Sequence, residues 1–234
     1  SLLCGAEAAA TTRSAQREGR SIDWSENVGG QCEDRGQGTG DLLTPELEAH
    51  GMDLPLWVYP LFENRRRHLS GQRSADYAAG MGRLLERFNA VAVGNPYATH
   101  REALSAERIS TVARDNRLVS EPYTKWMVAK DGVNQGAALV LVSAGLARRL
   151  GIAEQRWVYP LSHAQGLELP ILERPDLADS PVLRHAYKTA LERAGISASA
   201  VSHFDLYSCF PVVVSLALEA LGIDHTDPRA LTVT

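Results

Sequence analysis

Three adjacent side chains, those of Tyr207, Ser208 and Cys209, are the ones best placed to do chemistry in this sequence. They follow residues 203–207, which are typical of a strand, and precede residues 211–221, which are typical of an apolar helix. A thiol at such a junction lies near the amides of the helix N-terminus, which favour a thiolate. Cys209 is therefore a candidate reactive cysteine, although we favour its interpretation as a small buried side chain under the turn.

The remaining polar candidates are more dispersed. His163 follows an expected strand end and could face a cavity, although a lone histidine is more often solvated. Lys125 and Lys130 could contact the phosphates of a ligand, with solvated surface charge as an equally good interpretation. Cys4 and Cys32 lie far from each other and from the turn, so metal-ligand spacing and a disulfide pattern are both absent.

Residues 65–67 are three consecutive arginines, and guanidinium groups bind phosphate with paired hydrogen bonds. We favour a solvated face beside Glu63 over a phosphate site for this run. Gly132 and Gly136 lead into a strand-like segment instead of a helix, so they do not form a phosphate loop of the dinucleotide-binding kind. They are better suited to a close approach of the backbone to a ligand.

Helices are expected wherever apolar residues recur at spacings of three and four between capping signals. Ser180 as N-cap, Pro181 at the first helical position and Gly195 as the stop mark the clearest of them. The expected helices run from Ser74 to before Asn95 and cover 105–113, 144–150, 180–195 and 211–221.

Strands are expected between these helices. Residues 137–142 form a continuous apolar run, which favours a strand buried on both faces, and residues 156–161 and 203–207 are the next candidates. Residues 19–60 are rich in glycine and proline and are expected to be mostly loop. Strands that alternate with helices predict a layered α/β fold.

Composition restricts the class of protein. The chain has 234 residues, of which 44% are hydrophobic and 22% charged, as in an ordinary globular protein. A net charge of −4 provides no positive field for a nucleic acid. No apolar run approaches the ~20 residues that cross a bilayer, so the cytoplasm is the expected location. The chain begins without methionine and stops in strand-like sequence, so we expect an interior part of a longer protein.

Several stretches resemble thiolases of the bacterial sterol-carrier type. Residues 180–222, with Phe-Asp-Leu-Tyr-Ser-Cys-Phe-Pro at 204–211, are similar to the C-terminal half of thiolases, in which this turn carries an Asn-Glu-Ala-Phe motif. Residues 123–125 and 131–138 resemble the stretch that passes coenzyme A, and residues 5–8 fit an earlier strand-to-helix junction. The resemblance covers most of the chain and is strongest over 120–234.

The resemblance implies a thiolase fold, in which two βαβαβαββ halves with mixed sheets form layers and a loop domain is inserted. Residues 1–18 would end the N-terminal half, and 19–122 would form the inserted loop domain. Residues 123–152 would supply the last strand and helix of the N-terminal half, and 153–234 part of the C-terminal half.

The same resemblance implies the site. Catalytic positions fall on Tyr207, Ser208 and Cys209, and coenzyme A would be bound by Lys125, Lys130, Asp131, Gly132 and His163. Thiolases use a cysteine nucleophile, a histidine base and two oxyanion holes, and the nucleophile and base motifs fall outside this sequence. The first position of the turn motif is tyrosine here, where thiolases have asparagine and the sterol-carrier-type branch has histidine, and a phenol is larger.

The leading functional hypothesis is an acetyl-CoA acetyltransferase-like protein of lipid metabolism that transfers acyl groups on thioesters. The second is a thiolase-like protein that binds coenzyme A without catalysis, and the third makes Cys209 the nucleophile of a hydrolase or acyl carrier. Acyl-CoA is the expected partner and substrate, with no tightly bound cofactor and no metal. A homodimer is one expected assembly, although the sequence does not give the oligomeric state.

Overall fold

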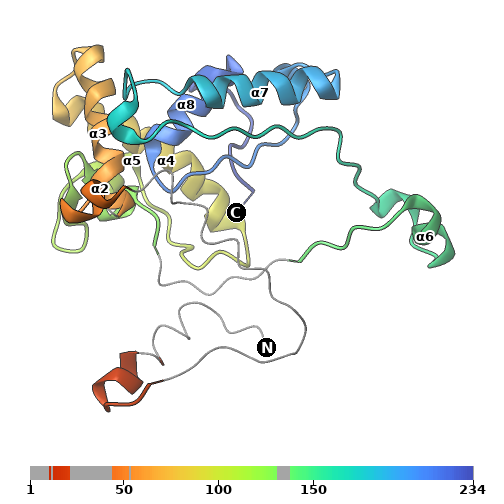
Figure 1. The fold of residues 1–234 in the computed structure, drawn as a ribbon, viewed down its shortest axis with the longest axis horizontal. Helices are drawn as coiled ribbons and strands as arrows, with labels where there is room; N and C mark the ends of the chain where they lie inside the picture. Colours follow the sequence, from red (N-terminus) through yellow and green to blue (C-terminus); the bar gives the residue numbers. More distant parts are fainter. Residues whose placement is uncertain (1–10, 12, 22–43, 53, 131–137, 234) are drawn as a thin grey trace. The chain divides into compact units, whose positions relative to one another are not determined.

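The computed structural model describes residues 11, 13–21, 44–52, 54–130 and 138–233 (Figure 1). The chain divides into two compact units, which are described separately. The smaller comprises Ser1–Gln31 and Lys130–Ser162, and the larger comprises Cys32–Ala129 and His163–Thr234. No helix among the described residues is long and apolar enough to span a membrane.

Helices dominate the larger unit, which also contains one small antiparallel sheet. In this sheet Leu118 lies opposite Thr124, and Ser120 lies opposite Tyr123. The elements of the larger unit are α2 (Pro45–Ala49), α3 (Pro55–Ser70), α4 (Ser74–Gly94), α5 (Ala106–Ser110), β1 (Leu118–Ser120), β2 (Tyr123–Thr124), η1 (Lys125–Met127), η3 (Ile171–Glu173), α7 (Pro181–Ala194), η4 (Ala198–Ala200) and α8 (Pro211–Leu221). The smaller unit contains α6 (Ala144–Arg149) and η2 (Glu154–Arg156).

The helices expected from the sequence are confirmed at α4, α5, α6, α7 and α8. In α7 the Ser180 hydroxyl accepts a hydrogen bond from the Leu183 amide, and Gly195 ends the helix with φ of 67°. Gly222 ends α8 in the same left-handed conformation, which glycine adopts without steric cost. These caps are local in sequence, so the sequence alone locates them.

Residues 19–60 were expected to be mostly loop, and the described part of this stretch contains α2 and the first turns of α3, which begins at Pro55. Residues 22–43 and 53 lie outside the described residues. Proline within a helix normally removes a backbone hydrogen bond, and Pro60 lies inside α3. The helix forms nonetheless because its apolar face is buried: Phe62 is 8% exposed, and Tyr59 packs against the same core. Tertiary packing therefore outweighs the local signal of the proline.

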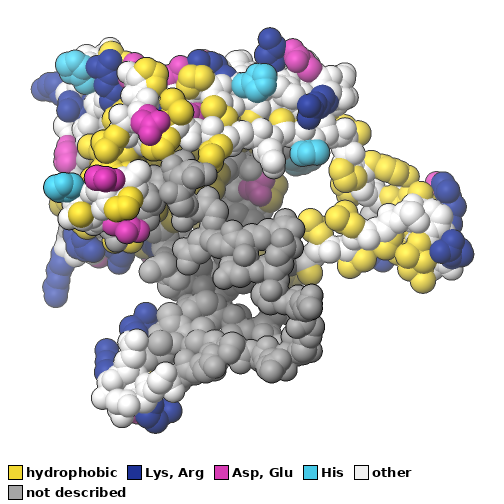
Figure 2. Space-filling model, in the orientation of Figure 1, with side chains coloured by type: hydrophobic (Ala, Val, Ile, Leu, Met, Phe, Trp, Pro, Cys, Tyr) yellow, Lys and Arg dark blue, Asp and Glu magenta, His cyan; other side chains and the backbone are white. Residues whose placement is uncertain are grey.

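The three expected strands are corrected as well, because the structure assigns no strand at 138–142, 157–161 or 203–207, and Arg156 belongs to η2. In the last of these segments one backbone hydrogen bond, from the Leu206 amide to the Leu231 carbonyl at 2.9 Å, forms without a strand. Ala137 lies outside the described residues. Val140 is 86% exposed, and Figure 2 shows hydrophobic side chains along the segments that flank α6. An apolar strand is stable only when neighbouring strands satisfy its backbone and other layers cover its faces, and no described segment does this for 138–142. The layered halves and the division into four segments expected from the sequence stay predictions.

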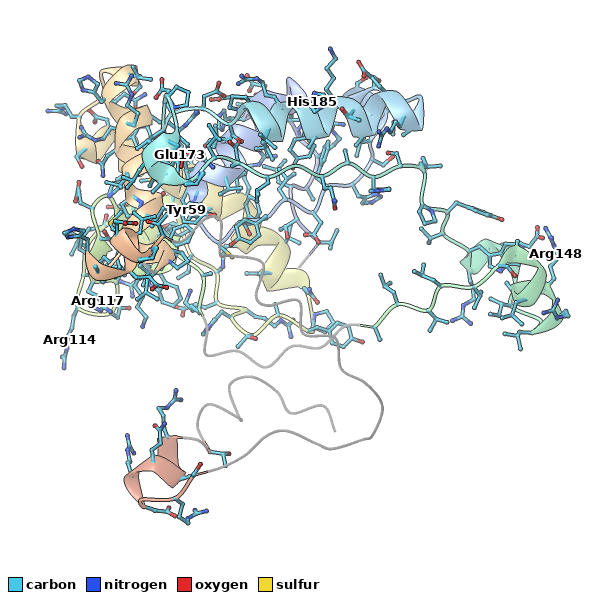
Figure 3. The ribbon with its side chains drawn as sticks, in the orientation of Figure 1. Tyr59, Arg114, Arg117, Arg148, Glu173 and His185 are labelled. Atoms are coloured by element: carbon cyan, nitrogen blue, oxygen red, sulfur yellow. The ribbon has the colours of Figure 1, made fainter. Side chains whose placement is uncertain are left out.

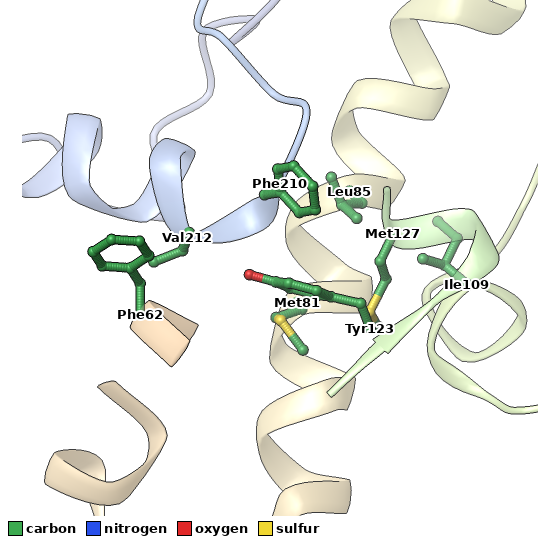
Figure 4. Packing of buried hydrophobic residues seen from close by; sticks show 8 residues of the cluster. All are labelled: Phe62, Met81, Leu85, Ile109, Tyr123, Met127, Phe210 and Val212. Atoms are coloured by element: carbon green, nitrogen blue, oxygen red, sulfur yellow. The ribbon is translucent and has the colours of Figure 1, made fainter. Parts of the chain in front are cut away.

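Two hydrophobic clusters form the core of the larger unit, and α4 and α8 contribute to both. The first cluster, shown in Figure 4, consists of Phe62, Met81, Leu85, Ile109, Tyr123, Met127, Phe210 and Val212. The second consists of Leu84, Phe204, Leu206, Val214, Ala217, Leu218, Ile223 and Leu231. In α4 the adjacent residues Leu84 and Leu85 face different clusters, and in α8 Val212 and Val214 do the same, so these two helices join the two halves of the core.

A fully buried asparagine positions η1 against α5. The Asn116 amide nitrogen donates to the carbonyl oxygens of Ile109 at 2.9 Å and Thr111 at 2.9 Å. Its side-chain oxygen accepts from the Trp126 amide at 2.9 Å. The Asn116 side chain thereby satisfies backbone groups at the end of α5 and in η1, and the Ile109 carbonyl also accepts from the Thr124 hydroxyl of β2 at 2.6 Å. The segment that follows β2 is consequently held in place.

Glu63 joins α3 to three other elements. Its side chain is only 1% exposed, and its two carboxyl oxygens accept hydrogen bonds from Tyr77 of α4 at 2.6 Å and Tyr123 of β2 at 2.7 Å. It also accepts a hydrogen bond from the Val212 amide in the first turn of α8. The N-cap residue of α8 is Phe210, whose side chain has no hydrogen-bond acceptor. Glu63, from a distant part of the sequence, supplies the acceptor for the first turn of α8 instead.

Burial raises the pKa of the Glu63 carboxyl above its ordinary value of 4.5, although the two tyrosine hydroxyls and Arg66 oppose that rise. A raised pKa means that the folded state holds a proton that the unfolded chain releases. The contribution of Glu63 to stability is therefore fully present below the unfolded pKa and is lost as the pH rises through the folded pKa.

We predict that Glu63→Gln, which mimics the neutral carboxyl, becomes more stable relative to wild type as the pH is raised from 4.5 to 8. The measurement is the free energy of unfolding in urea at several pH values across this range. A difference between the two proteins that does not change with pH would show that Glu63 has no raised pKa in the folded state.

Candidate functional site

The turn expected at residues 207–210 lies directly before α8, and its last residue, Phe210, belongs to the first core cluster. Tyr207 is 57% exposed, Ser208 and Cys209 are partly buried, and Phe210 is 4% exposed. Exposure thus falls along the turn, from the Tyr207 ring at the surface to the Phe210 ring in the core.

The phenol of Tyr207 and the thiol of Cys209 interact directly. Partial burial, a side-chain hydrogen bond with Cys209 and the proximity of Tyr59 together raise the pKa of Tyr207, with burial as the largest cause. Tyr207 is therefore a neutral hydrogen-bond donor at physiological pH. Cys209 forms no disulfide.

Aromatic side chains from two distant segments support the turn from below. The ring of Tyr59 in α3, labelled in Figure 3, stacks on Phe210 with centroids 4.3 Å apart and planes 6° from parallel. Tyr123 of β2 packs against Phe210 at 5.5 Å. Burial and then the proximity of Cys209 raise the pKa of the Tyr59 hydroxyl, while Arg174 lowers it. The turn therefore rests on a rigid aromatic base.

Lys125 belongs to a segment that passes beside the turn. The Ala129 amide donates to the Cys209 carbonyl at 3.0 Å, which ties the end of this segment to the turn. Lys125 itself is exposed, and its ammonium group lies 5.8 Å from the centre of the Trp126 ring. The structure thus brings the segment of Lys125 and the turn of Cys209 together.

The other residues expected to bind coenzyme A are His163, Lys130, Asp131 and Gly132. His163 is exposed, and its carbonyl accepts from Arg193 of α7 at 3.1 Å. Lys130 belongs to the smaller unit, and Asp131 and Gly132 lie outside the described residues. Their roles stay predictions. No group of three or more His, Cys, Asp or Glu side chains in the described part of the chain could hold a metal ion.

Sequence reasoning missed the groups that position the turn. Glu63 was expected beside a solvated face, whereas it is buried, and Arg66 is largely buried as well, with its guanidinium paired to Glu219 of α8. The available signal was the apolar spacing of Leu56, Tyr59 and Phe62, which fits one face of a helix that begins at Pro55. The proline at position 60 obscured it.

Chemically, this arrangement is suited to binding more than to proton abstraction. Tyr207 supplies a hydroxyl that can donate to a carbonyl oxygen, and the buried carboxyl group of Glu63 already engages the Val212 amide at the α8 N-terminus. The contacts that the structure gives the Cys209 thiol in its described surroundings are to phenols, which are poor bases at neutral pH. An activating imidazole is not part of this cluster.

No protein-family model matches the chain, and no curated protein sequence matches it either. Solved structures are similar to it, and two of them are described. A complex described as an Ltp2-ChsH2(DUF35) aldolase has 20% sequence identity and a TM-score of 0.54, over 94% of this chain and 57% of that one. At this identity the likeness shows the fold alone.

The other is a monomeric SCP2-thiolase-like protein, type 1, from Mycobacterium smegmatis. It has 42% sequence identity and a TM-score of 0.76 over 82% of this chain, which spans 42% of the length of that protein. The chain belongs to the thiolase superfamily, in its SCP2-thiolase-like branch.

Proposed function

We propose that this chain forms part of an acyl-coenzyme A site in a thiolase-type acyltransferase, with the turn at Tyr207 and Cys209 at the acyl end of the ligand. The observation that supports this most is the partly exposed phenol and thiol pair beside the segment of Lys125, in a member of the SCP2-thiolase-like branch. The acyl-CoA would be a substrate and not a resident cofactor.

The roles of individual residues follow from their chemistry. Tyr207 would donate a hydrogen bond to the thioester oxygen, where charge develops during acyl transfer. Lys125 would attract the phosphates of coenzyme A, because its ammonium group is exposed. Lys130, Asp131, Gly132 and His163 are proposed to contact the rest of the ligand on the basis of the family resemblance alone.

A non-catalytic coenzyme A-binding protein is the second candidate. It is favoured by the identity of residue 207, because a phenol is larger than the asparagine or histidine that related enzymes have at this position and would reshape the site that binds the oxyanion. Measurements of binding and of turnover separate the two candidates. A homodimer stays a prediction.

We predict that acetyl-CoA binds and that Tyr207→Phe weakens this binding by about 1 kcal/mol, or roughly five-fold, through the loss of one neutral hydrogen bond. Titration calorimetry measures the affinity. The matched control is Tyr187→Phe in α7, where the ring packs against the second core cluster, and this change is expected to leave the affinity unchanged. Equal affinities for wild type and Tyr207→Phe would assign the turn a structural role.

We predict that the 234-residue chain alone does not thiolyse acetoacetyl-CoA, because the cysteine and histidine motifs that the family uses are not in its sequence. Loss of absorbance of the enolate form of acetoacetyl-CoA reports the reaction. Turnover that scales with protein concentration and disappears in Cys209→Ala would instead make Cys209 the nucleophile.

A further inference from the structure

An arginine-lined cavity lies in the larger unit between α3, α4, α8 and residues 225–228. Its volume is about 560 Å³, which falls within the range of small-molecule sites. Three of its lining side chains are Arg66, Arg83 and Arg87, and none of its lining residues belongs to the turn at 207–210 or to the segment of Lys125. The cavity is therefore separate from the site of the proposed function and goes beyond it.

Two of the three arginines, Arg83 and Arg87, form no ion pair with a carboxylate in the described part of the chain. Arg87 donates to the backbone carbonyls of His225, Asp227 and Arg229, and carbonyls are neutral acceptors. Arg83 is exposed along α4 and has no hydrogen bond or ion pair to a described residue. Positive charge thus remains on one wall of the cavity.

The third arginine is only partly satisfied. The terminal nitrogens of Arg66 pair with Glu219 and donate to the Ala178 carbonyl at 2.7 Å. Its Nε atom is buried without a hydrogen-bond partner among the described residues. A buried N–H without an acceptor is costly, and an acceptor atom placed in the cavity would remove that cost.

The one acidic side chain that lines the cavity is already engaged. Asp227 forms an ion pair with Arg229 at 2.7 Å, and the hydrogen bonds from Arg229 lower the pKa of its carboxyl to about 2. Because the Asp227 carboxylate is paired with Arg229, it forms no ion pair with Arg83. The remaining polar lining includes Gln72, His225 and Thr226, which can donate hydrogen bonds to an anion.

We propose that this cavity binds the phosphate group of a small anionic ligand. Guanidinium groups recognise phosphate through paired charged hydrogen bonds, and α3 and α4 place three of them around one space. Arg87 and Arg66 are held by their contacts to the backbone and to Glu219, so the site is preorganised. Arg83 is the side chain available to close on the ligand.

The test is titration calorimetry of the full chain with inorganic phosphate, with ionic strength held constant by sodium chloride. Wild type is expected to bind phosphate saturably, and Arg83→Gln to bind about ten-fold more weakly, as expected for one lost charged hydrogen bond. Arg83→Lys is expected to bind with intermediate affinity, because it keeps the charge without the paired geometry.

Two control variants locate the site. Arg114→Gln removes an exposed arginine, which projects away from the helices in Figure 3, and is expected to bind phosphate as wild type does. Lys188→Gln removes an exposed ammonium group of α7 that does not line the cavity, and is expected to do the same. The proposal is overturned if wild type shows no saturable binding, if Arg83→Gln equals wild type, or if a control variant weakens binding as much as Arg83→Gln does. Because no acyl-CoA is present, failure here is distinct from failure of the proposed function.

Discussion

The buried carboxyl group of Glu63 is the interaction on which the rest of the larger unit depends. It accepts hydrogen bonds from Tyr77, Tyr123 and the Val212 amide, and so connects α3 to α4, β2 and α8. An isolated carboxyl at this depth would be strongly destabilising, and the three donors are what make its burial tolerable. Loss of any one of them would leave an unsatisfied polar group in the core.

This connection extends to the candidate site through the rings. Tyr123 contacts Glu63 with its hydroxyl and Phe210 with its ring, and Tyr59 covers the other side of Phe210. The backbone at Cys209 is fixed further by the amide of Ala129. The turn therefore has a rigid aromatic base, with the phenol of Tyr207 exposed above it. A hydrogen-bond donor that is held in position before the ligand binds lowers the entropic cost of binding.

Sequence patterns located what is determined locally. The bounds of α7 follow from its caps at Ser180 and Gly195, and the end of α8 follows from Gly222. Each of these capping residues lies within a few residues of the backbone groups that it affects, so the sequence alone shows them. The location of the turn before α8 followed from the same signals. The strands expected at 137–142 and 203–207 depended instead on pairing partners that no local pattern reveals.

The base of the site could not be predicted for a similar reason. Glu63 lies about 60 residues from Tyr123 and far more from Val212, and a glutamate followed by a run of arginines normally indicates a solvated surface. Its burial becomes apparent only when α3, β2 and α8 are brought together. Pro60 concealed the helix that carries it, since local rules place proline outside helices.

The most direct test of the account is the rate at which iodoacetamide alkylates Cys209, followed by mass spectrometry of its peptide, with and without acetyl-CoA. If the turn forms the acyl end of the ligand site, bound acetyl-CoA covers the thiol, and the rate should fall in proportion to the fraction of protein that is bound. An alkylation rate that stays the same when calorimetry shows the protein to be saturated would contradict the account.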